Sequence, residues 1–252
     1  MEPLLTVEGL SREFGGFVAV DDISFALRAG ERRALIGPNG AGKSTLFNLL
    51  SGRLRPNSGS IRYEDREIQG CSAAEICRLG IARTFQITSI FSQLSPIENV
   101  QIALIAHRQQ SFRILRSSRR AYLDEAAELL AHVGLADKHG GRCGLLSYGD
   151  QKRLELAITL AMRPRLLLLD EPTAGMEAQS RRDIVALIRR LCDERALTLL
   201  FCEHDMESVF SIAETVTVLH QGRIVLEGPP DVVRADEMVR SIYLGTQHGA
   251  AS

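Results

Sequence analysis

The chain has 252 residues, of which 45% are hydrophobic and 24% are charged, proportions that are ordinary for a globular protein. Its formal net charge of −1 gives no overall positive field, so the composition does not favour a nucleic acid as partner. No apolar run exceeds five residues. A membrane-spanning helix needs roughly 18, so we expect no transmembrane segment.

The N-terminus and the cysteines point to a cytosolic protein. Residues 1–5 lack the positive flank and the long apolar block of a secretory signal, so we expect no export. The five cysteines are an odd number and form no Cys-x-x-Cys pair, which argues against a disulfide framework and against a zinc site. A reducing compartment fits both observations.

In chain order, the hydrophobic pattern predicts strands first and helices in the middle. Short apolar runs alternate with polar residues over positions 4–27, as in strands of a mixed or antiparallel sheet. Helical periodicity dominates from about residue 96 to 162. Between these regions we expect strands at 34–36, 60–63 and 80–85 and a helix near 73–79.

The last third of the chain predicts parallel strands. Residues 166–169 and 197–202 are continuously apolar, as in strands covered on both faces, and a predicted helix at 179–194 separates them. We therefore expect an α/β fold with a mixed or parallel sheet and flanking helices. Its nucleotide-binding core comprises residues 1–86, with an N-terminal antiparallel β subdomain, and residues 164–252; an α-helical subdomain at 87–163 interrupts it.

Residues 37–45 read Gly-Pro-Asn-Gly-Ala-Gly-Lys-Ser-Thr and match the phosphate-binding pattern GxxxxGK(S/T). The loop follows an apolar strand and opens an apolar helix, which the pattern requires; a glycine-rich turn before a helix is the weaker alternative. Lys43 can reach the β- and γ-phosphates, and the Ser44 hydroxyl can bind Mg²⁺. The residues expected to contact the nucleotide are Gly37, Pro38, Asn39, Gly40, Ala41, Gly42, Lys43, Ser44 and Thr45.

Two carboxylates, Asp170 and Glu171, follow the buried strand at 166–169. A strand of this kind delivers them to the carboxyl edge of the sheet, where ligands bind in open α/β folds. Asp170 is then placed to hold Mg²⁺, and Glu171 to polarise the water that attacks the γ-phosphate. Acidic residues after a strand are also common in turns, so this interpretation depends on the phosphate loop.

A third motif, Leu146-Ser147-Tyr148-Gly149-Asp150-Gln151, is followed by a helical run to residue 162. It resembles the LSGGQ signature of the ATP-binding cassette (ABC) ATPases, and the resemblance covers nearly the whole chain. Gln86 closes a predicted strand as the family's glutamine loop does, and His204 follows a strand as its switch histidine does. Phe14 matches the aromatic residue that stacks on adenine.

Each of these residues also has a simpler interpretation. Ser147 and Asp150 form the pattern of an ordinary helix-capping box, although a capped helix N-terminus can also bind an anion. His204 taken alone is more often a loop or packing histidine. Phe14 has a rival in Phe17, and either aromatic side chain can simply fill core.

The signature departs from the family pattern in two places. Tyr148 replaces the first glycine, which implies ordinary helical geometry there and makes Gly149 the glycine expected to face nucleotide. Asp150 replaces glutamine, and we expect its side chain to turn back to the Ser147 amide as a cap. Glu177 stands where the family usually has Asp, so no role is carried over to it.

The resemblance implies a site shared between two chains. Lys43 of one subunit would hold ATP while Ser147 and Gly149 of a second ATP-binding subunit, a copy or a paralogue, close over it. The catalytic residues implied are Glu171, His204, Gln86 and Lys43. Mg²⁺ would be held by Ser44, Gln86 and Asp170.

The resemblance also implies membrane partners. The mainly apolar stretch from Ile87 to Val100 resembles the family's groove for a transmembrane permease, although core packing explains each of its residues equally well. A periplasmic substrate-binding protein would act indirectly, and the chain would lie at the cytoplasmic face of the inner membrane. The basic segment from Arg108 to Arg120 reads as a solvated loop, with anionic lipid contact as a minor alternative.

Four short segments look most like the ATP-binding subunits of bacterial branched-chain amino acid importers. Related urea or amide importers share much of this pattern, and the lipopolysaccharide-export ATPase ends similarly but keeps both signature glycines. A soluble ABC ATPase of DNA repair or translation fits less well, as does a P-loop kinase. The segments are residues 83–86, 154–157, 202–206 and 242–245.

Overall fold

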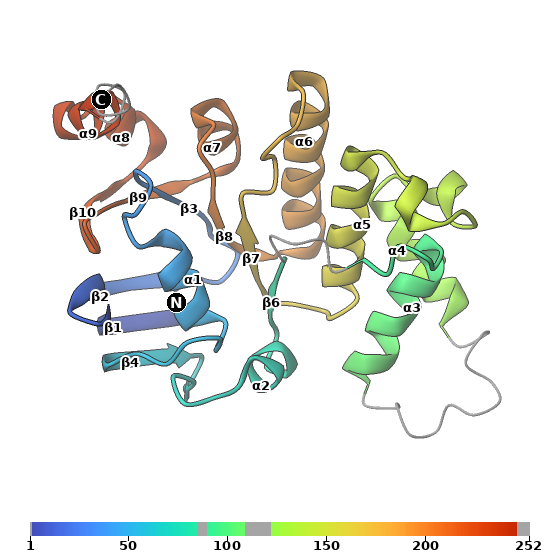
Figure 1. The fold of residues 1–252 in the computed structure, drawn as a ribbon, viewed down its shortest axis with the longest axis horizontal. Coiled ribbons are helices and arrows are strands. Elements are labelled where there is room, and N and C mark those ends of the chain that lie inside the picture. Colours follow the sequence, from blue (N-terminus) through green and yellow to red (C-terminus); the bar gives the residue numbers. More distant parts are fainter. Residues whose placement is uncertain (1, 85–89, 109–121, 246–252) are drawn as a thin grey trace.

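A computed structural model of the chain describes residues 2–84, 90–108 and 122–245. Its centre is a six-stranded sheet in the order β10-β9-β3-β8-β7-β6 (Figure 1). Neighbouring strands are parallel except β9 and β10, which pair antiparallel. The strands are β3 (Arg32–Ile36), β6 (Ile81–Arg83), β7 (Leu166–Asp170), β8 (Thr198–Cys202), β9 (Thr215–His220) and β10 (Arg223–Gly228).

A second, antiparallel sheet lies beside the first, in the order β2-β1-β4-β5. Helix α1 (Lys43–Leu50) packs between the two sheets, because Leu46 and Phe47 share one buried cluster with Leu5 of β1 and Leu168 of β7. The predicted N-terminal β subdomain is therefore present. Its strands are β1 (Pro3–Phe14), β2 (Phe17–Arg28), β4 (Ser58–Tyr63) and β5 (Arg66–Glu67).

Strands β7 and β8 are buried along their whole length, as their continuous apolar runs predict. Leu166 and Leu168 face the cluster around α1, whereas Leu167 and Leu169 face a second cluster. That cluster contains residues of α5 (Tyr148–Leu160), α6 (Ala178–Arg195) and α7 (Met206–Ile212). Helices therefore cover both faces of the central sheet.

The helices between β6 and β7 are grouped on the far side of β7 from α1 (Figure 1). Helix α3 begins at Pro96 with a capping box, in which Ser95 and Glu98 each satisfy a backbone amide of the other. This group matches the predicted helical region, while its division at residues 87 and 163 stays a prediction. The remaining helices are α2 (Ala73–Arg78), α3 (Pro96–His107), α4 (Leu123–His132), α8 (Pro230–Ala235) and α9 (Glu237–Gly245), with single turns at Ala136–Lys138 and Cys143–Leu145.

None of the helices in residues 2–84, 90–108 and 122–245 combines the length and the apolar character needed to cross a membrane.

Because both faces of β7 are covered, truncation on either face should destabilise the protein. We expect Leu167→Ala and Leu168→Ala each to lower the free energy of unfolding by about 2 to 5 kcal/mol, since both side chains are buried. Leu145→Ala is the control: this leucine is 85% exposed, and its loss should cost no more than about 0.5 kcal/mol. Urea unfolding measures all three; a silent Leu167→Ala or Leu168→Ala contradicts the two-sided burial.

Candidate active site

The phosphate loop turns sharply between β3 and α1, and its glycines are required for that turn. Gly42 directly precedes α1 with φ of 105°, and a Cβ atom there would lie 2.3 Å from the Ala19 carbonyl oxygen of β2. Gly40 also has positive φ, at 80°, but a Cβ atom there would meet no other group within 4 Å. The loop therefore packs against β2 at Gly42 while its tip at Gly40 stays open.

Lys43 is the first residue of α1 and is only 8% exposed. Its ammonium donates to the carbonyl oxygens of Gly37 (2.6 Å) and Pro38 (3.0 Å), so it lies across the mouth of its own loop. Burial lowers the pKa of Lys43, although the nearby carboxylates of Glu171 and Asp170 act in the opposite direction. Such a desolvated cation binds an anion strongly, because an anion removes the cost of its burial.

Asp170 ends β7 with a buried side chain that pairs with Arg83 of β6 at 2.8 Å. The same guanidinium donates to Asn48 Oδ1 of α1 (2.8 Å) and to Ser51 Oγ just after that helix (3.2 Å), and it lies over the Phe47 ring. One arginine thus connects α1, β6 and β7. In the sequence Arg83 stands out only through the family resemblance, because its place beside Asp170 depends on the pairing of β6 with β7.

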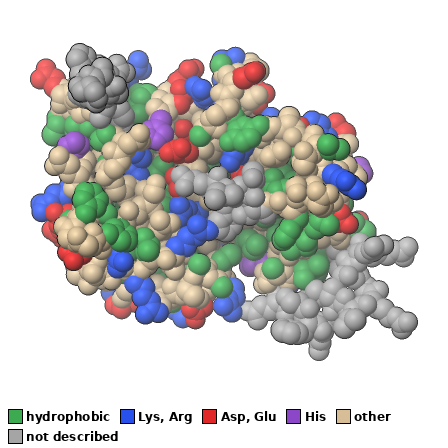
Figure 2. Space-filling view, in the orientation of Figure 1, with side chains coloured by type: hydrophobic (Ala, Val, Ile, Leu, Met, Phe, Trp, Pro, Cys, Tyr) green, Lys and Arg blue, Asp and Glu red, His purple; other side chains and the backbone are tan. Residues whose placement is uncertain are grey.

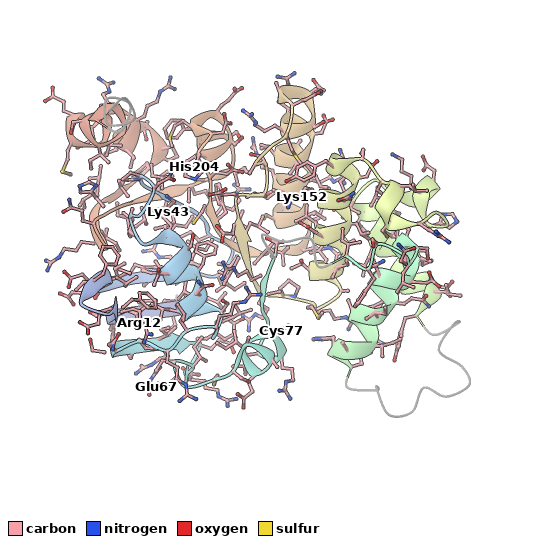
Figure 3. The ribbon with its side chains drawn as sticks, viewed as in Figure 1. Arg12, Lys43, Glu67, Cys77, Lys152 and His204 are labelled. Atoms are coloured by element: carbon pink, nitrogen blue, oxygen red, sulfur yellow. The ribbon has the colours of Figure 1, made fainter. Side chains whose placement is uncertain are left out.

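Glu171 and His204 come together at the carboxyl edge of the sheet. His204 Nε2 lies 2.8 Å from Glu171 Oε1, and because a carboxylate only accepts, this nitrogen carries the hydrogen. Both side chains are partly exposed, so the pair is open to a ligand. Figure 3 labels Lys43 and His204, which lie at the same edge of the sheet.

Glu171 also holds an unusual backbone conformation, with φ of 50°. A residue with a Cβ atom pays about 1 to 2 kcal/mol for this left-handed geometry. Its amide donates to the Cys202 carbonyl oxygen of β8 at 3.0 Å. The turn is therefore strained and is held in place by its neighbours.

The signature serine caps α5, but Asp150 behaves differently from the expectation. Ser147 Oγ accepts a bond from the Asp150 amide (3.2 Å) and donates to Asp150 Oδ2 (2.7 Å), which also accepts from Lys138 (2.6 Å). The predicted bond to the Ser147 amide is thus replaced by one from its hydroxyl. Burial acts to raise the pKa of Asp150, but the bonds from Lys138 and Ser147 outweigh it and lower that pKa.

Tyr148 has the helical backbone geometry that its size implies, being the first residue of α5. Its hydroxyl donates to the Ala174 carbonyl oxygen at 3.1 Å, and its ring edge lies 3.8 Å from where a Cβ on Gly175 would be. The side chain therefore points to the turn that follows Glu171. Ser147 stays exposed and Gly149 partly exposed, as contact with another chain requires.

Three other predicted positions are less informative. Phe14 is 42% exposed at the end of β1, with the Arg12 guanidinium 4.7 Å from its ring centre, and Phe17 is 63% exposed. Figure 2 shows hydrophobic side chains gathered on the side of the molecule where β1 and β2 lie. Glu177 immediately precedes α6 and makes no capping bond through its side chain within the described part of the chain. Gln86 lies outside the described residues.

The proposed groove is only partly described, because Ile87 falls outside the described residues. Of the rest, Ile90 and Ile97 pack against the core, Val100 is fully buried, and Phe91 is 55% exposed. A separate cavity of about 180 Å³ lies between α2, β6 and α5. Its walls include Ile76, Cys77, Ile81, Thr84, Ile158 and Met162.

The basic segment is described only at its start. Arg108 pairs with Glu125 at 2.7 Å and lies over the Tyr122 ring, so it is tied to α4. The rest of the segment, up to Arg120, lies outside the described residues.

A model of the ABC transporter family matches residues 20–174. The chain belongs to the ABC transporter ATP-binding family. Curated relatives align over almost their whole length. The branched-chain amino acid transport ATP-binding protein BraF of Pseudomonas aeruginosa is 38% identical over 96% of this chain and 98% of its own. LivG of Escherichia coli, with the same description, is 37% identical over 97% and 98%.

Solved ABC cassettes have the same fold. The ADP conformation of an ATP-binding cassette of an ABC transporter superposes with a TM-score of 0.86 at 28% identity, over 97% of this chain and all of that one. A nucleotide-free cassette gives 0.85 at 28% identity, over 96% of this chain and 99% of that one. The predicted ABC ATPase fold is confirmed, and the chain is an ATP-binding and ATP-hydrolysing member of this family.

The pairing of Arg83 with Asp170 makes a stability prediction. We expect Arg83→Met to lower the free energy of unfolding by about 3 kcal/mol, because it leaves a buried carboxylate without its cation. The double variant Arg83→Met/Asp170→Asn should lose less than the sum of its single variants. Urea unfolding without nucleotide measures the cycle, and strictly additive losses contradict the coupling.

Proposed function

We propose that this chain is the ATPase subunit of a membrane importer for branched-chain amino acids. Its support is the 37–39% identity, over nearly the whole chain, to ATP-binding proteins of high-affinity branched-chain amino acid transport. The lipopolysaccharide export protein LptB of Acidithiobacillus ferridurans is also similar, at 36% identity over 98% of this chain. Tyr148 favours the importer, because it replaces the first signature glycine. On the family resemblance, the lipopolysaccharide-export ATPase keeps both signature glycines.

The phosphate loop is proposed to hold the triphosphate of ATP. Lys43, already desolvated, would exchange its two backbone carbonyl partners for the β- and γ-phosphate oxygens, and the amides at the start of α1 would face the same anion. Phe14, exposed at the end of β1, is proposed to stack on adenine. ATP binding thereby relieves the cost of burying Lys43.

The residues beside the loop fit Mg²⁺. The exposed Ser44 hydroxyl and the Asp170 carboxylate are hard oxygen donors of the kind that this ion prefers. Gln86 is proposed as a further ligand on the family resemblance alone. When bound, Mg²⁺ offsets the negative charge on the β- and γ-phosphates. Arg83 fixes the direction of the Asp170 carboxylate through their 2.8 Å contact.

Hydrolysis is proposed to depend on the pair Glu171 and His204. Glu171 is placed to accept a proton from the attacking water, and its strained turn at the strand end presents the carboxylate outward. His204 donates to Glu171 here and would orient the water and the γ-phosphate. Because the two side chains lie within 2.8 Å of each other, one bound water would be able to contact both of them.

The second half of the site is proposed to come from another ATP-binding subunit. Ser147 caps α5 and Gly149 lies in its first turn, and this helix is across β7 from α1 (Figure 1). The two residues would therefore contact ATP held by the loop of a different chain. Ser147 must first release Asp150, to which its hydroxyl now donates. ATP would join the two subunits, and loss of its γ-phosphate would separate them.

Coupling to transport is proposed to pass through the membrane permease. The mainly apolar cavity of about 180 Å³ beside β6 has room for one large apolar side chain of a permease helix. A periplasmic binding protein would deliver substrate to the permease on the other side. The chain would then lie at the cytoplasmic face of the cell membrane.

The transporter reconstituted in vesicles with its binding protein tests this function. We expect uptake of labelled leucine driven by ATP, and we expect Glu171→Gln to abolish uptake and phosphate release while ATP still binds. The physical reason is that an amide cannot take the proton of the attacking water. Normal steady-state hydrolysis by Glu171→Gln contradicts the catalytic assignment, and uptake that ignores branched-chain amino acids contradicts the substrate.

A further inference from the structure

One buried carboxylate near the site has had no role so far. Glu203 lies between β8 and α7, immediately before His204, and is 3% exposed. Its Oε1 accepts from the Thr173 amide (2.8 Å) and from the Thr173 hydroxyl (2.6 Å). Its Oε2 accepts from the His204 amide at 3.1 Å. A buried acid with three donors of this kind is fully used by the protein and is closed to solvent.

These bonds join the two segments that carry the proposed catalytic pair. Thr173 lies two residues after Glu171 in the turn that leaves β7, and His204 follows Glu203 at the end of β8. The buried Glu203 carboxylate thus joins the two segments on their interior side, while the partly exposed side chains of Glu171 and His204 contact each other at 2.8 Å. One oxygen serves each segment, so both are fixed by the same rigid, planar group.

The turn needs such a support because it is strained. Glu171 has φ of 50°, and its own amide is held by the Cys202 carbonyl oxygen at 3.0 Å. Arg181 supports the turn further along, where it contacts the Met176 carbonyl oxygen and Asp205. Glu203 binds both segments: it accepts from the Thr173 amide, two residues after Glu171, and from the amide of His204 itself.

We propose that Glu203 is a positioning residue for ATP hydrolysis, which holds Glu171 and His204 at contact distance by joining Thr173 to the His204 amide. This inference rests on the proposed catalytic roles of Glu171 and His204. Glu203 is buried behind the pair and bonds to neither Lys43 nor the phosphate loop among its described contacts. Its loss therefore acts on turnover and leaves nucleotide affinity in place.

The substitution that tests this is Glu203→Gln, which keeps the size of the side chain. Its amide has one oxygen, so its NH₂ group must face the N–H of either Thr173 or His204, and the bond from that N–H is lost. We expect kcat to fall about 10- to 100-fold, since small displacements of catalytic groups have effects of this order. ATP affinity of the full chain should stay within about twofold of wild type.

Two matched variants grade the effect. Thr173→Val removes the hydroxyl bond but keeps the volume and the backbone bond, so it should lower kcat by only about threefold. Glu203→Asp keeps both oxygens on a shorter side chain and should restore part of the activity that Glu203→Gln loses. Thermal unfolding of each variant establishes that it folds.

A double-mutant cycle with His204→Ala separates positioning from a purely structural role. If Glu203 acts through His204, then Glu203→Gln and Thr173→Val should each cost little in kcat once His204 is already gone. Losses that multiply independently of His204 overturn the proposal. A wild-type kcat in both Glu203→Gln and Thr173→Val also overturns it. If Glu203→Gln does not fold, a wild-type kcat in both Thr173→Val and Glu203→Asp overturns it instead.

The Glu171→Gln variant, measured alongside, distinguishes the two levels of the account. Full hydrolysis by Glu171→Gln removes the catalytic assignment on which the inference rests. An inactive Glu171→Gln together with a fully active, folded Glu203→Gln leaves that assignment standing and removes only the positioning role.

Discussion

The structure depends on the burial of charge at one edge of its central sheet. Lys43, Asp170 and Glu171 arrive there because β3, β7 and β8 are parallel neighbours whose carboxyl ends coincide. Charges taken out of water must be paired or hydrogen-bonded. Lys43 therefore donates to two loop carbonyls, and Asp170 binds Arg83. Lys43 and Asp170 of these pairs are also the groups proposed to bind the nucleotide and Mg²⁺.

The turn after β7 receives support from three directions. Tyr148 of α5 binds its Ala174 carbonyl, Glu203 beyond β8 binds Thr173, and Arg181 of α6 binds Met176. These bonds hold Glu171 in a backbone geometry that it would leave if free. Helix α5 and the turn after Glu171 are thus in contact within one chain. Tyr148, which departs from the signature pattern, makes that contact.

Much of this could be predicted from sequence, because the relevant signals are local. The phosphate loop is fixed by its glycines and by the strand and helix beside it, and the burial of β7 follows from its four leucines. The missed contacts join residues far apart in the chain: Arg83 to Asp170, Thr173 to Glu203, and Tyr148 to Ala174. The order and register of the strands bring these residues together, and no short sequence pattern predicts strand order or register. Asp150 was mispredicted for a related reason, since Lys138 and a hydroxyl compete for its carboxylate.

The central claim is that an ATP site is completed by two chains, and the mass of the protein in solution tests it most directly. The variant Glu171→Gln, which should retain ATP, is compared with Glu171→Gln/Gly149→Asp by light scattering as ATP is added. Gly149 lies in the first turn of α5 with room for a side chain, so the second change adds a negative charge facing the partner's phosphates without disturbing the fold. The account predicts that both variants bind ATP and that only the first doubles its mass. An equal doubling by both would contradict it.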